Sequence, residues 1–281
     1  MYNKQKTGQD SPLLSKPLTR KPVRQTVQVH GLTVHYEVAG ANAGEALVLV
    51  HGFSESTRLW YRNLPALTEN YRVYLVDLPG FGLMGRCGQH FSLPGAGEWL
   101  HAWMQAVGLE EAHLIGHSMG GYVSMALAAR HPESVKRLVL VDSIGIPLGL
   151  PAVRLVPMVL KAIVYTTPIS LWLRMGRDYL RMRVTTIRNV VRQIVALDGS
   201  AVVAAVHVPT LLIWGENDDL IPFAAGRQLH QSLPGARLLV IQGANHFCMY
   251  ERPAEFNAAL SAFLEGQDVG IEAALDDKQI E

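Results

Sequence analysis

The chain has 281 residues, of which 49% are hydrophobic and 17% are charged, and its formal net charge at pH 7 is +1. This length suits one large α/β domain or two small ones, and it can bury a core without disulfide or metal cross-links. The composition excludes a disordered, collagen-like or disulfide-rich protein, and the near-zero charge argues against a dedicated nucleic-acid binder. Cys87 and Cys248 are too few for a zinc site, and we expect reduced thiols in a cytoplasmic protein.

The two ends of the chain carry opposite charges. Residues 1–24 contain six basic residues and one acidic residue, and no apolar run of signal-peptide length follows them. The last 17 residues contain six acidic residues and one basic residue. We expect both ends to be solvated tails. Because no stretch reaches about 18 uncharged apolar residues, we expect no transmembrane helix.

Short apolar runs alternate with helical patterns between these tails. Strands with so few polar residues are typical of a sheet that is covered on both faces and joined by crossover helices. The pattern therefore predicts an α/β fold with a mostly parallel, eight-stranded sheet. The predicted strands are residues 26–29, 32–38, 46–50, 72–76, 113–115, 135–141, 210–214 and 237–241, and the predicted helices are residues 98–107, 122–130, 224–233 and 253–264.

Residues 144–206 interrupt this alternation. They contain no clear strand, and Pro151, Pro157 and Pro168 divide them into two to four predicted helices. The segment has eight basic and two acidic residues, and Arg174, Arg177 and Arg181 recur at the three- and four-residue spacing of one helix face. We interpret it as a helical insertion over the end of the sheet.

A serine between two glycines marks the predicted chemistry. The sequence Gly116-His117-Ser118-Met119-Gly120 matches the pattern G-x-S-x-G, with an apolar strand before it and a helical pattern after it. On a sharp strand-to-helix turn, small neighbours let the chain close and lift the serine hydroxyl clear of the sheet. The first N–H groups of the helix then face the group under attack, where a helix N-terminus favours negative charge. The pattern predicts a nucleophilic serine.

A serine hydroxyl needs a base, and the base needs an acid to orient it. In this architecture both follow the serine along the chain, the acid first. The predicted seventh strand ends in a loop with Asp218 and Asp219, and the eighth ends in a loop with His246. Because open α/β sheets assemble their sites at the carboxyl ends of their strands, we expect these side chains to meet Ser118.

Further motifs accompany these residues. They are His51-Gly52-Phe53 with Trp60, the run from Asp77 to Gly82, Gly121 after the serine motif, Gly215 with Asp218 and Pro222, and His246 with Glu251 and Pro253. With them the chain resembles the α/β-hydrolase superfamily over residues 27–264, in its capped, serine-nucleophile, esterase- and lipase-like branch. The resemblance implies Ser118 as nucleophile, Asp218 as acid and His246 as base. It also implies an oxyanion hole made by the backbone N–H groups of Phe53 and Met119.

The resemblance also implies a domain organisation. A flexible basic tail would occupy residues 1–24, and an acidic tail residues 266–281. The α/β-hydrolase core would comprise residues 25–143 and 207–265. The inserted segment, residues 144–206, would be the helical cap that forms the substrate pocket, and we expect Phe53, Trp60 and Met119 to line that pocket.

Neighbouring residues compete for the nucleophile and acid roles. Ser118 could instead be a helix N-cap, which is a common role of serine. Asp219 competes with Asp218, although the family spacing of three residues after Gly215 favours Asp218. Asp142 is a weaker rival, since some members of the superfamily place the acid at the end of that strand.

Two other histidines compete with His246 for the role of base. His51 precedes the oxyanion turn, and we expect it to hold that loop by hydrogen bonds. His117 neighbours the serine, but we expect it to point elsewhere on so sharp a turn. His246 alone stands at the position that the resemblance assigns to the base.

These features predict hydrolysis of carboxylic esters with apolar acyl or alkyl groups through an acyl-enzyme. A serine at position 118 excludes haloalkane dehalogenases and epoxide hydrolases, which attack with an aspartate. Met119 departs from prolyl iminopeptidase-like members, which often carry tryptophan after the serine. The alternative reaction is hydrolysis of a carbon–carbon bond in ring-fission diketones, which the arginines within residues 174–192 leave open. A non-catalytic binding module on the same fold is the alternative from another class.

No cofactor or metal is indicated, and the expected partner is a small apolar ester rather than nucleic acid. The net charge of +6 on residues 144–206 admits two interpretations. One is a solvated face whose arginine stems cover apolar surface. The other is peripheral contact with an anionic membrane, which would make a cytoplasmic protein membrane-peripheral. The oligomeric state stays open.

Overall fold

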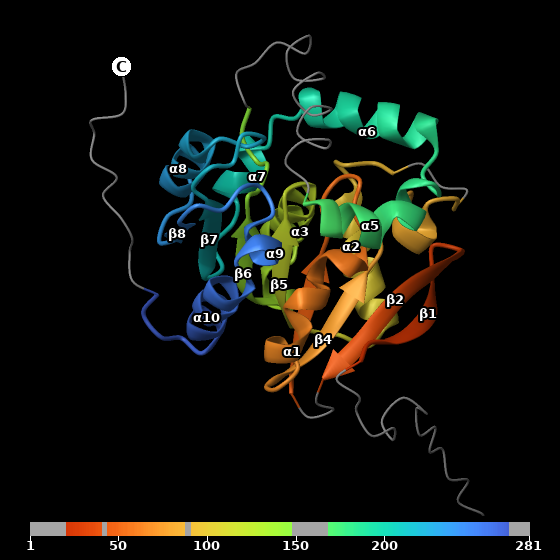
Figure 1. Ribbon diagram of the computed structural model, residues 1–281, viewed down its shortest axis with the longest axis horizontal. Coiled ribbons are helices and arrows are strands. Elements are labelled where there is room, and N and C mark those ends of the chain that lie inside the picture. The colour runs from red at the N-terminus through yellow and green to blue at the C-terminus, as the bar shows by residue number, and fades with distance from the viewer. Residues whose placement is uncertain (1–20, 41–43, 88–90, 148–167, 270–281) are drawn as a thin grey trace, which may run out of the picture.

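The computed structural model describes residues 21–40, 44–87, 91–147 and 168–269. Eight strands form one sheet in the order β1-β2-β4-β3-β5-β6-β7-β8 (Figure 1). β2 runs antiparallel to β1 and β4, and all other neighbouring pairs are parallel, which confirms the predicted sheet. The strands are β1 Val23–Val29, β2 Leu32–Gly40, β3 Glu45–Val50, β4 Tyr71–Val76, β5 Ala112–His117, β6 Val135–Val141, β7 Thr210–Gly215 and β8 Arg237–Ile241.

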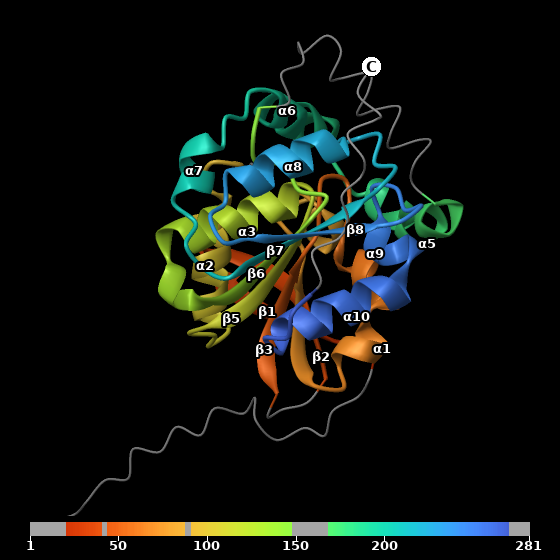
Figure 2. The same cartoon turned by 90° about the vertical axis from the view of Figure 1, so that its left-hand side faces the viewer.

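Helices cover both faces of the sheet. Figure 2 shows α2, α3 and α8 on one face, and α1 and α10 on the other. The α-helices are α1 Leu64–Leu67, α2 Ala96–Ala106, α3 Met119–Arg130, α5 Ile169–Tyr179, α6 Val184–Val195, α7 Ser200–Ala204, α8 Phe223–Gln231, α9 Cys248–Glu251 and α10 Pro253–Leu264, and the 3-10 helices are η2 Thr57–Arg62, η3 Gly82–Met84 and η4 Pro132–Ser134. None of the helices in the described ranges is both long and apolar enough to cross a bilayer.

Strand β3 shows why its sequence is almost wholly apolar. Val48 and Val50 belong to the hydrophobic cluster on the face of α2 and α3, whereas Leu47 and Leu49 belong to the cluster on the face of α10. Successive side chains of a strand point to opposite faces, so a strand covered on both sides must be apolar at every position. Burial on both faces therefore explains the pattern that predicted the central strands.

The described residues cover part of the inserted segment and only the inner boundaries of the two predicted tails. Between β6 and β7 the described residues form three helices, α5, α6 and α7, whereas residues 148–167 lie outside the described part. β1 begins at Val23, so Val23 and Arg24 belong to the sheet rather than to the predicted tail. Val269 is buried against the core, so the chain continues to pack beyond residue 265.

The topology brings the candidate residues to one edge of the sheet. In parallel strands all carboxyl ends lie on the same side. His51 follows β3, Ser118 follows β5, Asp142 follows β6, Asp218 follows β7 and His246 follows β8. These residues come from loops as far apart as positions 51 and 246, and the fold gathers them at this edge.

Candidate functional site

Ser118 stands between β5 and α3 in a strained backbone conformation. Its φ and ψ angles are 52° and −116°, a region that residues other than glycine rarely occupy. A Cβ at Gly116 would collide with the carbonyl oxygen of Gly120, and a Cβ at Gly120 would meet the carbonyl oxygens of Val50 and His51. The two glycines of the motif therefore let the turn close against β3.

Asp218 and His246 form a buried pair at the same edge. The Oδ2 atom of Asp218 lies 2.7 Å from Nδ1 of His246. The other carboxylate oxygen accepts the backbone N–H groups of Leu220 and Ile221, which fixes the carboxylate in place. Asp219 is exposed to solvent. The geometry thus favours Asp218 over Asp219 as the partner of His246.

The Ser118 hydroxyl makes no hydrogen bond to any residue that the structure describes, so His246 is not bonded to it in this conformation. The His246 imidazole nevertheless lies next to the serine turn, because its ring centre is 4.7 Å from that of His117. Catalytic hydrogen bonds are often long or misaligned until substrate binds. The structure therefore joins Asp218 to His246 and shows no hydrogen bond between His246 and the Ser118 hydroxyl.

The loop after β3 lies directly against Ser118. A Cβ at Gly52 would come within 3.0 Å of the Cβ of Ser118. His51 holds this loop as expected, since its Nδ1–H donates to the Gly52 carbonyl and its Nε2 accepts the N–H of Leu78. Within the described ranges, the backbone N–H of Phe53 has no hydrogen-bond acceptor. It is available to an oxyanion formed at the serine.

Asp142 is a second buried carboxyl group next to the pair. Its backbone is also in the left-handed region, with φ of 44°, and its Oδ1 accepts the N–H of Gly215 at 2.7 Å. Among the residues described, no nitrogen or oxygen donor reaches its Oδ2, and the Cys248 thiol lies beside the carboxyl group. Burial, followed by the nearby charge of Asp218, raises the pKa of Asp142 well above its usual value. No hydrogen bond joins it to His246 in the described part, so Asp218 remains the favoured acid.

His246 keeps its proton more strongly than an ordinary histidine. Burial on its own would lower the pKa of the imidazole, but the negative charge of Asp218 and the hydrogen bond to it outweigh burial and raise the pKa of His246 to about 9. The imidazolium form is therefore stabilised next to Ser118. This is the form that a general base reaches once it has accepted a proton.

Glu55 was missed by the sequence analysis. It is 4% exposed, and its Oε2 accepts the N–H of Gly52 and lies 3.0 Å from Nδ1 of His117. The prediction that His117 points away from the site was wrong, because its Nε2–H donates to the carbonyl of His246 at 2.8 Å. The contact between Glu55 and His117 joins residues 62 positions apart in the chain. In the sequence, only the position of Glu55 shortly after the Gly52-Phe53 turn could have suggested it.

Two of the predicted pocket residues are core residues instead. Trp60 has no exposed surface and packs against Phe256 of α10, with ring centres 6.3 Å apart. Met119 is equally enclosed, because the helix after the turn directs this side chain into the core cluster. Phe53 is partly exposed and packs edge-on against Phe81. Of the three predictions, Phe53 is the one whose side chain can contact a ligand.

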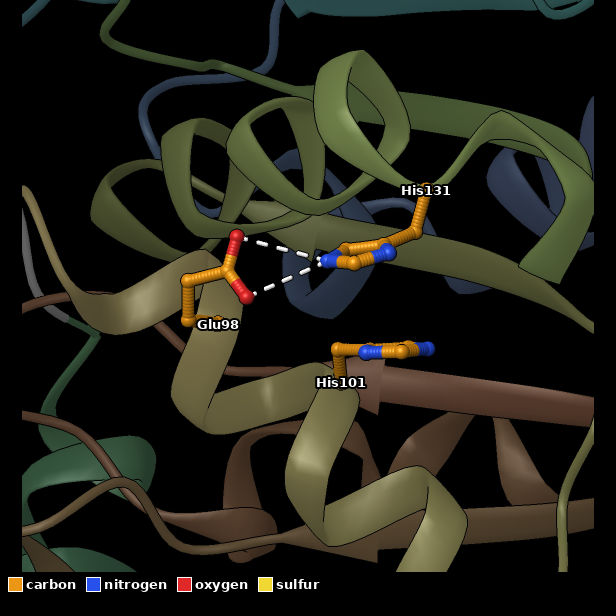
Figure 3. A group of neighbouring side chains, drawn as sticks. All are labelled: Glu98, His101 and His131. Carbon is orange, nitrogen blue, oxygen red and sulfur yellow. Dashed lines mark hydrogen bonds and ion pairs between the residues drawn. The ribbon is translucent and has the colours of Figure 1, made fainter.

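A cluster of Glu98, His101 and His131 carries ligand atoms of the kind that bind metal ions (Figure 3). Nε2 of His131 lies 3.1 Å from Oε2 of Glu98, and the two imidazole rings are stacked 3.8 Å apart at 12°. The nitrogen lone pairs of an imidazole lie in the ring plane, so nearly parallel rings do not direct them at one ion. We interpret the cluster as a hydrogen-bonded link between α2 and the end of α3.

The mostly parallel sheet, the helices on both faces and the serine turn at the carboxyl edge of the strands define an α/β enzyme fold. The chain belongs to the alpha/beta hydrolase family. The model of that family matches residues 47–259, which run from within β3 to within α10 and include all the candidate residues described above.

Known proteins with different activities are similar to this chain. A 2-hydroxy-6-oxononadienedioate/2-hydroxy-6-oxononatrienedioate hydrolase of Paraburkholderia phymatum is 31% identical over 83% of this chain and 91% of its own length. A pimeloyl-(acyl-carrier protein) methyl ester esterase of Aeromonas hydrophila is 30% identical over 79% and 96%. The crystal structure of a membrane phospholipase A, a bacterial virulence factor, has a TM-score of 0.76 and 26% identity over 88% of this chain and 87% of that chain.

Proposed function

We propose that the protein is a serine hydrolase that cleaves carboxylic esters through an acyl-enzyme. Ser118 is the nucleophile and His246 is the general base. Asp218 orients the imidazole of His246 and stabilises its protonated form. One observation carries this proposal: the strained serine turn lies at the same sheet edge as the buried Asp218–His246 pair. In that pair Oδ2 of Asp218 lies 2.7 Å from Nδ1 of His246.

The reaction follows from these positions. His246 takes the hydroxyl proton as the Ser118 oxygen attacks the ester carbonyl, and the N–H groups of Phe53 and Met119 bind the oxyanion. The tetrahedral intermediate expels the alkoxide, which takes the proton from His246 and leaves as an alcohol. Water then loses a proton to His246 and attacks the acyl-enzyme, releasing the acid and restoring Ser118.

Two similar proteins support an ester substrate. The Aeromonas relative is a methyl ester esterase and the solved structure is a phospholipase, so both cleave carboxylic esters. Phe53, the partly exposed aromatic side chain of the oxyanion loop, suits an apolar acyl or alkyl group. We therefore place p-nitrophenyl esters of increasing chain length first among trial substrates.

Hydrolysis of a carbon–carbon bond is the second candidate. It is favoured by the 31% identity to a hydrolase of oxo-dienedioates. The same three residues would serve, but the substrate would place carboxylate groups near the site. Rates on p-nitrophenyl esters against rates on a ring-fission diketone separate the two reactions.

Covalent labelling tests the proposal. A fluorophosphonate probe should modify Ser118 of the purified protein, and Ser118→Ala should lose both the labelling and the ester hydrolysis. Ser124→Ala is the matched control, because Ser124 is a buried serine of α3 whose hydroxyl donates only to the Gly120 carbonyl. An unlabelled Ser118 in folded protein would favour a non-catalytic binding module.

A further inference from the structure

The large apolar side chains with the greatest exposed fractions lie together on one segment. Among the described residues, Ile169 is 78% exposed, Leu173 81%, Leu180 80% and Val184 79%. All four belong to α5, the turn after it and the start of α6, which lie at the upper end of the molecule in Figure 1. Clustered apolar exposure of this kind marks an interaction surface, whereas scattered exposed apolar residues need no explanation.

Basic residues surround these apolar side chains. Residues 168–197 contain six arginines and one acidic residue, Asp178, whose side chain is buried. Arg174 and Arg177 are exposed on the same side of α5 as Leu173 and Leu180. We define the α5 face as Ile169, Leu173, Arg174, Arg177, Leu180 and Val184. A helix with apolar and basic residues on its exposed side is typical of segments that lie in a membrane interface.

The other side of α5 is fastened to the candidate site. Asp178 accepts a hydrogen bond from the Ser56 hydroxyl at 2.8 Å and faces Nε of Arg58 at 3.4 Å. On the exposed side, near the amino end of α5, Ser170 accepts a hydrogen bond from the Tyr250 hydroxyl at 3.0 Å. Ser56 follows the oxyanion loop and Tyr250 follows the His246 loop. A surface that binds the α5 face is therefore held close to both loops.

We propose that the α5 face docks the protein on the surface of an anionic phospholipid bilayer. The apolar side chains would enter the interface while the arginines pair with lipid phosphates. The charge selects this partner, because the exposed part of the segment carries no carboxylate to oppose a negative surface. The proposal does not depend on the reaction at Ser118.

Co-sedimentation of the full chain with vesicles tests the docking. Wild type should bind phosphatidylglycerol vesicles at low salt, bind them less at high salt, and not bind pure phosphatidylcholine vesicles. Arg174→Gln with Arg177→Gln should weaken binding about thirtyfold, since each basic group adds about one factor of five. Leu173→Ser with Leu180→Ser should weaken binding at low salt by at least about tenfold.

Two exposed residues elsewhere provide matched controls, namely Val23→Ser on β1 and Arg227→Gln on α8, which should bind like wild type. Absence of wild-type binding to phosphatidylglycerol at low salt overturns the proposal, and so does unchanged binding by Leu173→Ser with Leu180→Ser. A concentration-dependent dimer abolished by that double variant would assign the face to a second copy instead. Labelling of Ser118 should be equal in all variants, which separates docking from the proposed function.

A second inference comes from the buried Glu55–His117 pair. The carbonyl of His246 can only accept, so Nε2 of His117 carries a proton. The 3.0 Å contact between Nδ1 and Oε2 of Glu55 then requires another proton, on the imidazole or on the carboxyl group. Glu55 and His117 therefore share one proton in a buried pair beside Ser118.

We infer that Glu55 and His117 are positioning residues for the reaction proposed at Ser118. The pair links the Gly52 N–H, in the loop that carries Phe53, to the carbonyl of His246. Three of the four non-glycine residues with positive φ in the described chain, Ser54, Ser118 and Asp142, lie in the loops at this edge of the sheet. Strained loops persist only where their surroundings hold them in place.

Glu55→Gln tests this role with nearly unchanged shape. The same Oε2 atom meets the Gly52 N–H and His117 Nδ1, and an amide at that place satisfies both only if His117 is charged or releases the His246 carbonyl. We expect kcat to fall about tenfold or more with KM little changed. The ¹⁵N NMR shifts of the His117 ring nitrogens should change as well.

Glu45→Gln is the matched control. Glu45 pairs with His113, which lies on β5 like His117 but at the opposite end of that strand. It should leave kcat and the His117 shifts unchanged. If Glu55→Gln does not fold, His117→Gln replaces it, because a glutamine amide can still donate to the His246 carbonyl. Its kcat should also fall about tenfold or more with KM little changed. A kcat within about twofold of wild type overturns the inference, provided that wild-type Ser118 reacts with the fluorophosphonate probe. Unreactive wild-type protein would instead refute the proposed function.

Discussion

Strand β5 has a histidine near each end, and each histidine pairs with a glutamate from another part of the chain. The two pairs differ in their surroundings. At the amino end, Nε2 of His113 lies 2.9 Å from Glu45, whose side chain is 54% exposed and also binds Lys136. At the carboxyl end, Nδ1 of His117 lies 3.0 Å from Glu55, whose side chain is 4% exposed. Water screens the first pair, whereas the second can interact only with its protein neighbours.

The comparison extends to the two edges of the sheet. At the amino edge, charged side chains form ion pairs that solvent reaches, as in Lys136 with Glu45 and Glu111. At the carboxyl edge, Asp142, Asp218 and His246 are buried together. Buried charges interact strongly, and pKa values shift most where they gather. The same residue types thus form exposed ion pairs at one edge and the proposed catalytic site at the other.

The largest effect should follow removal of the negative charge at Asp218. Asp218→Asn keeps the shape of the side chain, but its amide cannot stabilise the imidazolium of His246 or hold the correct tautomer. We expect kcat for ester hydrolysis to fall about 10⁴-fold. Asp219→Asn, at the exposed neighbouring position, should have kcat close to wild type. Equal losses in the two variants would contradict the assignment of the acid.

The sequence predicted the sheet well where strands are buried on both faces. The predicted strand at residues 135–141 coincides with β6, and Pro253 marks the first residue of α10, as expected for proline in a first helical turn. β1 was predicted three residues too short, because its first residues alternate between exposed and half-buried positions and carry little apolar signal. Periodicity reports burial, so it misses strands that solvent reaches.

The site was predictable only where its residues follow linear motifs. Ser118, Asp218 and His246 each follow a strand at a recognisable spacing, and the structure places all three at one edge. The link between Glu55 and His117 depends on how two loops meet in space, which no local spacing encodes. Nor does the sequence near Trp60 reveal that Phe256, almost two hundred residues later, encloses it.

The second prediction concerns pH. His246 must be neutral to accept the proton of Ser118, and its pKa is raised to about 9. We expect kcat/KM for a p-nitrophenyl ester to rise with pH to a midpoint near 9. Below that midpoint the value should fall about tenfold for each pH unit. The measurement is a pH profile corrected for spontaneous hydrolysis, and a flat profile through neutral pH would contradict the raised pKa.

The third prediction is a gain in stability from Asp142→Asn. Because the pKa of Asp142 is raised in the folded state, the protein loses stability as pH rises above the pKa of the unfolded chain. Asparagine keeps the acceptor for the Gly215 N–H and tolerates the positive φ. We expect the free energy of unfolding at neutral pH to increase by about 1 kcal/mol, measured with urea. The gain should disappear in acid, and a loss at neutral pH would contradict it.

The smallest effect should come from Glu45→Gln at the amino edge. Hydrogen bonds from Lys136 and then His113 lower the pKa of Glu45 to about 2. Its contribution to stability is therefore complete above the pKa of the unfolded chain and is lost as pH falls towards about 2. Because solvent screens this exposed group, we expect a loss of only about 0.2–1 kcal/mol in the free energy of unfolding at neutral pH. The pH profile of ester hydrolysis should not move. A shifted profile would mean that charges at the two ends of β5 are coupled, and the contrast between the two edges of the sheet would then not hold.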